Sequence, residues 1–114
     1  MKNLNTLSLP QNDNSAINEA LSELNQKYAV NSVYLFGSKA RGDYDEYSDI
    51  DLLLVLEKTP SSQSEKQIVE LLFDIGMKYN VLFSSLRTSV KEWNGMFKTF
   101  PIYKEIIDEG VRML

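Results

Sequence analysis

The chain has 114 residues, a formal net charge of −4 and neither cysteine nor histidine. This length predicts one domain, and the missing residue types exclude disulfides and thiolate metal sites and leave oxygen as the ligand for any metal ion. The acidic balance disfavours stable binding to nucleic acid, which depends on clustered Lys and Arg. No apolar run is long enough to span a bilayer, and the N-terminus lacks the apolar core of a signal peptide. We therefore expect a cytoplasmic protein without a membrane partner.

The first third of the chain predicts an arm, a helix and a strand. Residues 1–12 are polar and show no periodicity, so we predict a mobile N-terminal arm before a single domain over residues 13–114. The polar residues at 13–15 are good N-caps, and the apolar residues after them have helical spacing, which predicts a helix over about 15–28. Residues 32–36 then have the pattern of a first strand.

Strand and helix patterns alternate in the following segment. Residues 50–56 are mostly apolar on both faces, which is typical of a central, covered strand. Ser62 and Glu65 form a capping box, which opens a helix that ends near residue 78. A third strand is predicted over residues 81–88.

The last quarter carries clear start and stop signals for helices. Ser89 and Glu92 form a second capping box, and Pro101 is well placed as the first residue of a last helix that Gly110 ends. Residues 111–114 are predicted to add a short edge strand. The pattern as a whole predicts an α/β (α+β) fold, a small mixed β-sheet with helices on one face.

Two aspartates open the second predicted strand. Side chains alternate along a strand, so Asp49 and Asp51 share one face while Ile50 points into the core. Their Cα atoms would lie about 6.6 Å apart, close enough for both carboxylates to bind one cation or an ion cluster. The alternative interpretation is a solvated strand end whose acids merely face water.

A glycine turn precedes this acidic pair. Gly37 allows the backbone to turn and approach a ligand without a Cβ in the way, and Ser38 opens a helical turn whose N–H groups suit a phosphate. Lys39 and Arg41 flank the turn. Arg41 either clamps phosphate oxygens or pairs with a nearby acid to hold the loop. A phosphate turn beside two carboxylates predicts a Mg²⁺–nucleotide site.

These two motifs occur at a characteristic spacing. Gly37-Ser38, ten intervening residues and Asp49-Ile50-Asp51 resemble the signature of the DNA polymerase β-like nucleotidyltransferase superfamily. The fuller pattern is similar to that of its small single-domain branch, the minimal nucleotidyltransferases. It comprises the runs Phe36-Gly37-Ser38-Lys39-Ala40-Arg41-Gly42 and Ser48-Asp49-Ile50-Asp51-Leu52.

The resemblance implies the fold of that superfamily, ATP as substrate and Mg²⁺ as cofactor. It implies Asp49 and Asp51 as catalytic residues and metal ligands. The nucleotide-binding residues that it implies are Gly37, Ser38, Arg41 and Ser48. In this family the usual companion is an all-helical HEPN protein, often in a toxin–antitoxin pair in which the minimal nucleotidyltransferase adds AMP to a partner tyrosine.

One departure from the family pattern bears on activity. Active members usually supply a third carboxylate from the strand after the crossover helix, and our alignment places Ser84 at that position. Asp74, the nearest acid in the chain, lies on the preceding predicted helix. The loss of a general base would lower the rate about 10²–10⁴-fold.

Three functions therefore stay open from the sequence. The first is Mg²⁺-dependent transfer of a nucleoside monophosphate, AMP above all, to a hydroxyl of a protein partner. The second is a nucleotide-binding module that neutralises a HEPN partner by contact alone, and the third is a small-molecule or RNA nucleotidyltransferase. The expected partners are a helical HEPN-type protein, a nucleoside triphosphate and, as an open option, further copies of the chain.

Overall fold

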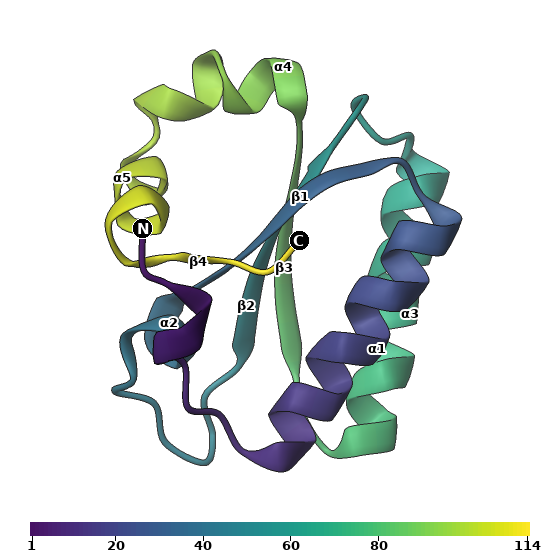
Figure 1. Cartoon of the computed structure of the whole chain (residues 1–114). Coiled ribbons are helices and arrows are strands. Elements are labelled where there is room, and N and C mark those ends of the chain that lie inside the picture. Colours follow the sequence, from purple (N-terminus) through teal and green to yellow (C-terminus); the bar gives the residue numbers. More distant parts are fainter.

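The computed structural model describes residues 1–114 and contains four strands, five α-helices and two 3-10 helices (Figure 1). In chain order these elements are η1 (Leu4–Thr6), α1 (Gln11–Lys27), β1 (Val30–Phe36), α2 (Gly37–Arg41), β2 (Ile50–Leu56), α3 (Ser62–Tyr79), β3 (Phe83–Ser89), α4 (Val90–Trp93), η2 (Met96–Thr99), α5 (Pro101–Glu109) and β4 (Val111–Arg112). None of the helices is both long and apolar enough to cross a membrane.

The four strands form one mixed sheet in the order β3-β2-β1-β4. β1 is antiparallel to both β2 and β4, whereas β2 and β3 are parallel. A parallel pair needs a crossover connection, and α3 provides it. The predicted mixed sheet is thus confirmed, and its two edges are β3 and the short β4.

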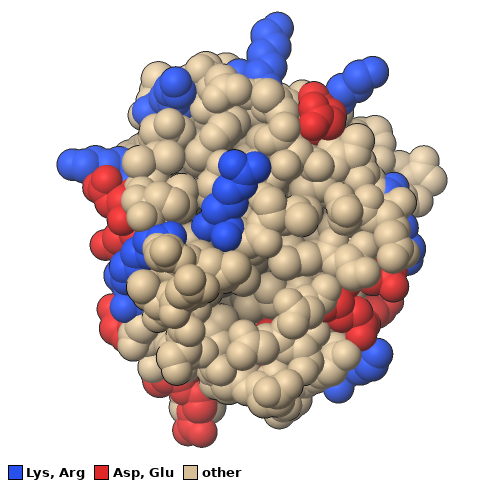
Figure 2. All heavy atoms as spheres, in the orientation of Figure 1, with Lys and Arg blue, Asp and Glu red and all other residues tan.

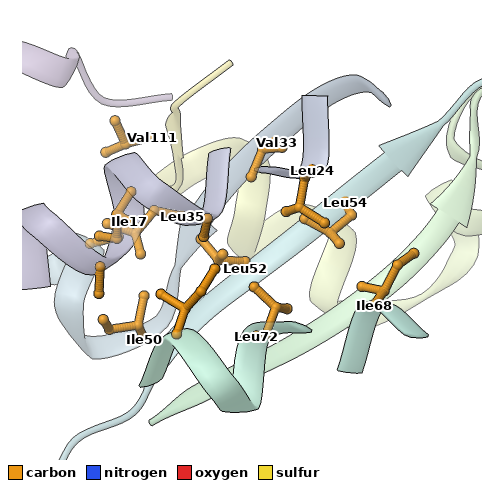
Figure 3. Packing of buried hydrophobic residues seen from close by; sticks show 14 of the residues in the cluster. Ile17, Leu24, Val33, Leu35, Ile50, Leu52, Leu54, Ile68, Leu72 and Val111 are labelled. Carbon is orange, nitrogen blue, oxygen red and sulfur yellow. The ribbon is translucent and has the colours of Figure 1, made fainter. Parts of the chain in front are cut away.

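Helices cover both faces of the sheet, so the prediction that they lie on one face is wrong (Figure 1). On one face α1 and α3 pack on the sheet and enclose the larger core cluster (Figure 3). The residues labelled there are Ile17 and Leu24 of α1, Val33 and Leu35 of β1, Ile50, Leu52 and Leu54 of β2, Ile68 and Leu72 of α3, and Val111 of β4.

The opposite face is covered by α4, η2 and α5. Its centre is Trp93, whose ring stacks on Tyr34 of β1 at a centroid distance of 5.3 Å and also contacts Phe97 and Tyr103. Leu53 of β2 is fully buried beneath this cluster. β1 and β2 carry apolar side chains at consecutive positions, so each face of these central strands has to be shielded from water.

Several predicted element boundaries hold, whereas α1 begins at residue 11 instead of about 15 and β1 at residue 30 instead of 32. β2 spans the predicted residues, and Ser89 caps α4 by accepting a hydrogen bond from the Glu92 N–H. The α3 N-cap is Ser61 instead of Ser62, because the Ser61 hydroxyl accepts from the Ser64 N–H. β3 starts at residue 83, two residues later than predicted.

The N-terminal segment contacts the domain along β4 and α2. Lys2 forms a β-bridge with Val111, and its Nζ lies 3.1 Å from the Ala40 carbonyl oxygen. The hydroxyl of Tyr44 donates to the Ser8 carbonyl at 2.9 Å. The last two residues of the predicted arm, 11 and 12, belong to α1, which begins directly after Pro10.

Candidate functional site

Gly37 lies where β1 ends and α2 begins, with φ +72°, in the left-handed region that favours glycine. A Cβ at this position would overlap the Oδ2 atom of Asp51. Phe36, the preceding residue, is the register partner of Asp51 across the β1–β2 pair. The turn after β1 and the start of β2 are thus in direct contact, as a joint phosphate and metal site requires.

The two aspartates lie at the start of β2, and their sharing of one face stays a prediction. Asp49 is exposed just before β2, and Asp51 is the second residue of the strand and only partly exposed. The parallel register pairs Asp51 directly with Ser84 of β3, and the Ser84 side chain acts to lower the pKa of the Asp51 carboxyl. The register thus places Ser84 beside Asp51, and its equivalence to the third carboxylate of the family stays a prediction.

The pKa of Asp51 is raised above its ordinary value. Burial is the largest cause, followed by the negative charges of Asp49 and Glu105, while Arg41 and the Ser84 side chain act in the opposite direction. A carboxylate that is partly buried beside other acids is a strained arrangement in the absence of a cation. This electrostatic cost is the kind that a bound divalent ion removes.

The side chains present fit an oxygen-liganded divalent ion. Asp49 and Asp51 offer only carboxylate oxygens, which Mg²⁺ prefers, and the missing side chain of Gly37 lets the Asp51 carboxylate lie directly against the turn. The structure contains no group of three or more Asp or Glu side chains gathered to hold a metal ion. The protein thus supplies two carboxylates, and substrate and water have to complete any coordination shell.

Arg41 pairs with acidic residues, one of the two roles that the sequence left open. Its Nε lies 3.2 Å from Asp43 Oδ2, and its Nη1 lies 3.2 Å from Glu105 Oε1 and 3.4 Å from Glu109 Oε2. The guanidinium group thereby connects the loop after α2 to α5. Phosphate binding by Arg41 stays a prediction, and it would require the side chain to exchange these carboxylates for phosphate oxygens.

Ser48 organises the loop that leads into β2. Its hydroxyl accepts a hydrogen bond from the Asp45 N–H at 3.0 Å and lies 3.2 Å from Asp45 Oδ1. The predicted contact of Ser48 with nucleotide stays a prediction. The same hydroxyl sets the path of the chain immediately before Asp49.

A buried ion pair beneath α2 was not anticipated from the sequence. Lys39 Nζ lies 2.7 Å from Asp13 Oδ2, and the two side chains are only 6% and 7% exposed. Lys39 also lies over the ring of Tyr44, 4.1 Å from its centroid. Asp13 shares the helical stripe of Ala16 and Ile17, and this apolar spacing was the available signal that it points inward.

A pocket of about 460 Å³ opens beside Asp49, between the loop after α2 and the C-terminal end of α3. Its polar wall includes Glu46 and Asp49, and its apolar wall includes Met77 and Leu82. Tyr47, at the rim, is 83% exposed. Figure 2 shows acidic side chains at the lower end of the molecule, where this loop lies, and basic side chains around α4 at the top.

Comparison with known proteins agrees with this geometry. The family model described as a nucleotidyltransferase domain matches residues 16–111. The chain belongs to this nucleotidyltransferase family. The matched residues include both aspartates, the glycine turn and the whole sheet except its last residue.

Curated relatives of this nucleotidyltransferase domain occur in Methanocaldococcus jannaschii. One candidate protein adenylyltransferase is 31% identical over 101 residues, which are 87% of this chain and 95% of that protein. Another is 38% identical over 60 residues, which are 53% of this chain and 61% of that protein. The second match thus spans less than two thirds of the relative's length.

Solved structures share the fold of this nucleotidyltransferase domain. A crystal structure of a toxin–antitoxin with AMP-PNP has a TM-score of 0.60 and 13% identity, over 90% of this chain and 72% of that chain. A mutant MntA–HpeT toxin–antitoxin structure has a TM-score of 0.58 and 15% identity, over 94% of this chain and 73% of that chain. A candidate nucleotidyltransferase from Sulfolobus solfataricus has a TM-score of 0.51 and 24% identity, over 76% of this chain and 81% of that chain.

Proposed function

We propose that this nucleotidyltransferase domain is a Mg²⁺-dependent protein adenylyltransferase, which transfers AMP from ATP to a hydroxyl of a protein partner. The observation that carries the proposal is the contact between Gly37 and Asp51, where only a glycine leaves space beside the carboxylate. Two relatives are named as candidate protein adenylyltransferases, which supports AMP as the transferred group and a protein as the acceptor.

Each side chain of the site has a defined task under this proposal. Asp49 and Asp51 would hold Mg²⁺, and the backbone at Gly37 and Ser38 would seat the β- and γ-phosphates of ATP. When bound, Mg²⁺ supplies positive charge that offsets the phosphate charge and lowers the barrier to displacement. Burial and neighbouring acids raise the pKa of Asp51, so the ionised site favours a cation.

The transfer itself is a displacement at the α-phosphorus. The acceptor oxygen bonds to this phosphorus, the bond from the phosphorus to the α,β-bridging oxygen breaks, and pyrophosphate leaves with the electron pair. The hydroxyl proton passes to solvent, because position 84 holds a serine and offers no carboxylate to accept it. We therefore expect slow turnover, about 10²–10⁴-fold below that of a site with a general base.

The partner that we propose is a helical HEPN-type toxin, with a tyrosine as the acceptor. Support comes from the fold shared with two toxin–antitoxin structures, one of which was obtained with AMP-PNP. Neutralisation of that partner by contact alone is a second candidate function. Ser84 at the third-acid position and the lack of a three-acid cluster favour it.

The decisive experiment incubates the purified protein and partner with Mg-ATP and weighs the partner by intact-mass spectrometry. We expect one or more added AMP masses that disappear with Asp49→Asn. The matched control is Asp74→Asn, because Asp74 is an exposed acid on α3. A partner that stays unmodified, yet is neutralised equally well by wild type and Asp49→Asn, would establish contact alone as the function.

A further inference from the structure

The edge strand β3 is protected along only part of its length. Exposed strand edges invite pairing with other chains, and proteins commonly block them with charged side chains. Here Arg87 provides the block: its Nη1 donates to the Ser85 carbonyl at 2.9 Å, and its Nε lies 3.1 Å from Glu65 Oε1. Toward the start of the strand, next to the candidate site, no such cover exists, and Leu82 is 60% exposed.

In the uncovered part of this edge, main-chain N–H and C=O groups point away from the sheet and are free to pair with another strand. The Leu82 carbonyl accepts from the Ile50 N–H at 2.8 Å, so the main chain of Leu82 faces β2. Main-chain groups of consecutive residues in a strand point to opposite sides, so those of Phe83 face outward. An extended segment of another protein can therefore add to the sheet at Phe83.

The pocket beside Asp49 continues this edge and indicates the chemistry of such a segment. Glu46 on its polar wall has no ion-pair partner in the structure, and Lys39 of the same lining is already paired with Asp13. Met77 and Leu82 on its other wall are apolar and more than half exposed. A lysine or arginine has an apolar stem and a charged end, so it matches both walls. The acidic side of the pocket is therefore complementary in charge to a basic segment.

We propose that the start of β3 and this pocket form the docking site for an extended, basic segment of the acceptor protein. The segment pairs with the main chain at Phe83 and places a lysine or arginine in the pocket. This inference rests on the proposed function, because it concerns the acceptor of that reaction. Addition of a strand to a sheet edge is an established mode of peptide recognition.

The geometry also constrains the position of the acceptor residue. Asp51 and Ser84 are paired in register, so a residue opposite Ser84 on an added strand has its Cα about 9.6 Å from that of Asp51, two strand spacings away. A tyrosine spans this gap over the small Ser84 side chain, whereas a serine is too short. The pocket lies on the α3 side of the sheet and Asp51 faces the other side, so the basic residue occurs at an odd spacing from the acceptor.

The test uses synthetic peptides of identical composition, each with one tyrosine and one lysine. In the odd-spaced peptides the lysine lies one or three residues from the tyrosine, and in the even-spaced peptides it lies two or four residues away. Peptide modification with Mg-ATP is followed by mass, and amide exchange at Phe83 is followed by NMR. We expect at least fivefold faster modification of the odd-spaced peptides and slower exchange at Phe83. A serine in place of the tyrosine should abolish modification.

Charge reversal in the pocket provides the matched protein variants. Glu46→Lys should slow modification of the lysine peptide about tenfold, and a peptide with glutamate in place of lysine should restore the rate. Glu70→Lys, the same change at an exposed position of α3 outside this pocket, is the control and should have no effect.

The outcomes separate this inference from the proposed function. Unchanged exchange at Phe83, equal rates for odd and even spacing, or no effect of Glu46→Lys would each overturn the docking site, even where AMP transfer occurs. Failure of Mg-ATP to bind, with Phe83 still protected by the peptide, would overturn the proposed function and leave the docking site standing.

Discussion

Substitution of Gly37 by alanine separates backbone strain from damage to the site. The left-handed backbone at φ +72° costs an alanine about 1–2 kcal/mol, and this should lower the melting temperature by roughly 4–8 °C. In addition, the new Cβ would overlap Asp51 Oδ2, so the carboxylate has to move. We expect Mg-ATP affinity to fall about 10–100-fold, the range seen when groups that orient metal ligands are changed.

Gly42 offers a matched control for this experiment. It has φ +91°, so Gly42→Ala has a comparable backbone cost, but no atom lies within 4 Å of the added Cβ. Thermal unfolding should therefore show similar losses for both variants, while calorimetric titration with Mg-ATP should show a loss of affinity for Gly37→Ala only. Equal ATP affinities for the two variants would refute the assignment of Gly37 to the site.

Three further predictions follow from the surroundings of the site. Burial and nearby acids raise the folded-state pKa of Asp51, so the free energy of unfolding should fall as pH rises from the ordinary aspartate pKa to this raised pKa. Urea unfolding measured across pH without metal should show that Asp51→Asn removes this decline. The same pH dependence in Asp51→Asn and wild type would contradict the prediction. Ser84→Asp should strengthen Mn²⁺ binding and speed AMP transfer, and unchanged metal titration would show that position 84 does not face the metal. Lys39→Met should lower the free energy of unfolding by about 3–5 kcal/mol, because it leaves the buried Asp13 without its partner. Urea unfolding should show that the double variant Lys39→Met/Asp13→Leu regains most of this stability.

The local features of the site could be predicted from the sequence because they depend on neighbouring residues. The turn at Gly37 and the two aspartates of β2 each lie within one short segment, where backbone freedom and strand alternation decide the geometry. The same applies to the Ser89 cap and to Pro101 at the start of α5. Alignment of the third strand with the family pattern singled out Ser84, and the structure pairs this residue with Asp51.

Contacts between distant segments were decided only by the tertiary structure. Arg41 had two possible partners in the sequence, and the packing of α5 against α2 placed Glu105 and Glu109 beside it, 64 and 68 residues away in the chain. The ion pair of Lys39 with Asp13 likewise depends on the first turn of α1 lying beside α2. Such pairings depend on the relative placement of helices, which local patterns do not encode.

The sequence by itself determined where the chain turns, which strand is central and which oxygens are available to a metal ion. It did not determine which helices cover which face, because the helices after β3 carry apolar stripes that either face of the sheet satisfies equally well. Only the assembled sheet, which brings Tyr34 and Leu53 together on its second face, required Trp93 and α5 to pack there. The burial of apolar area over the whole fold, and not any single segment, made that choice.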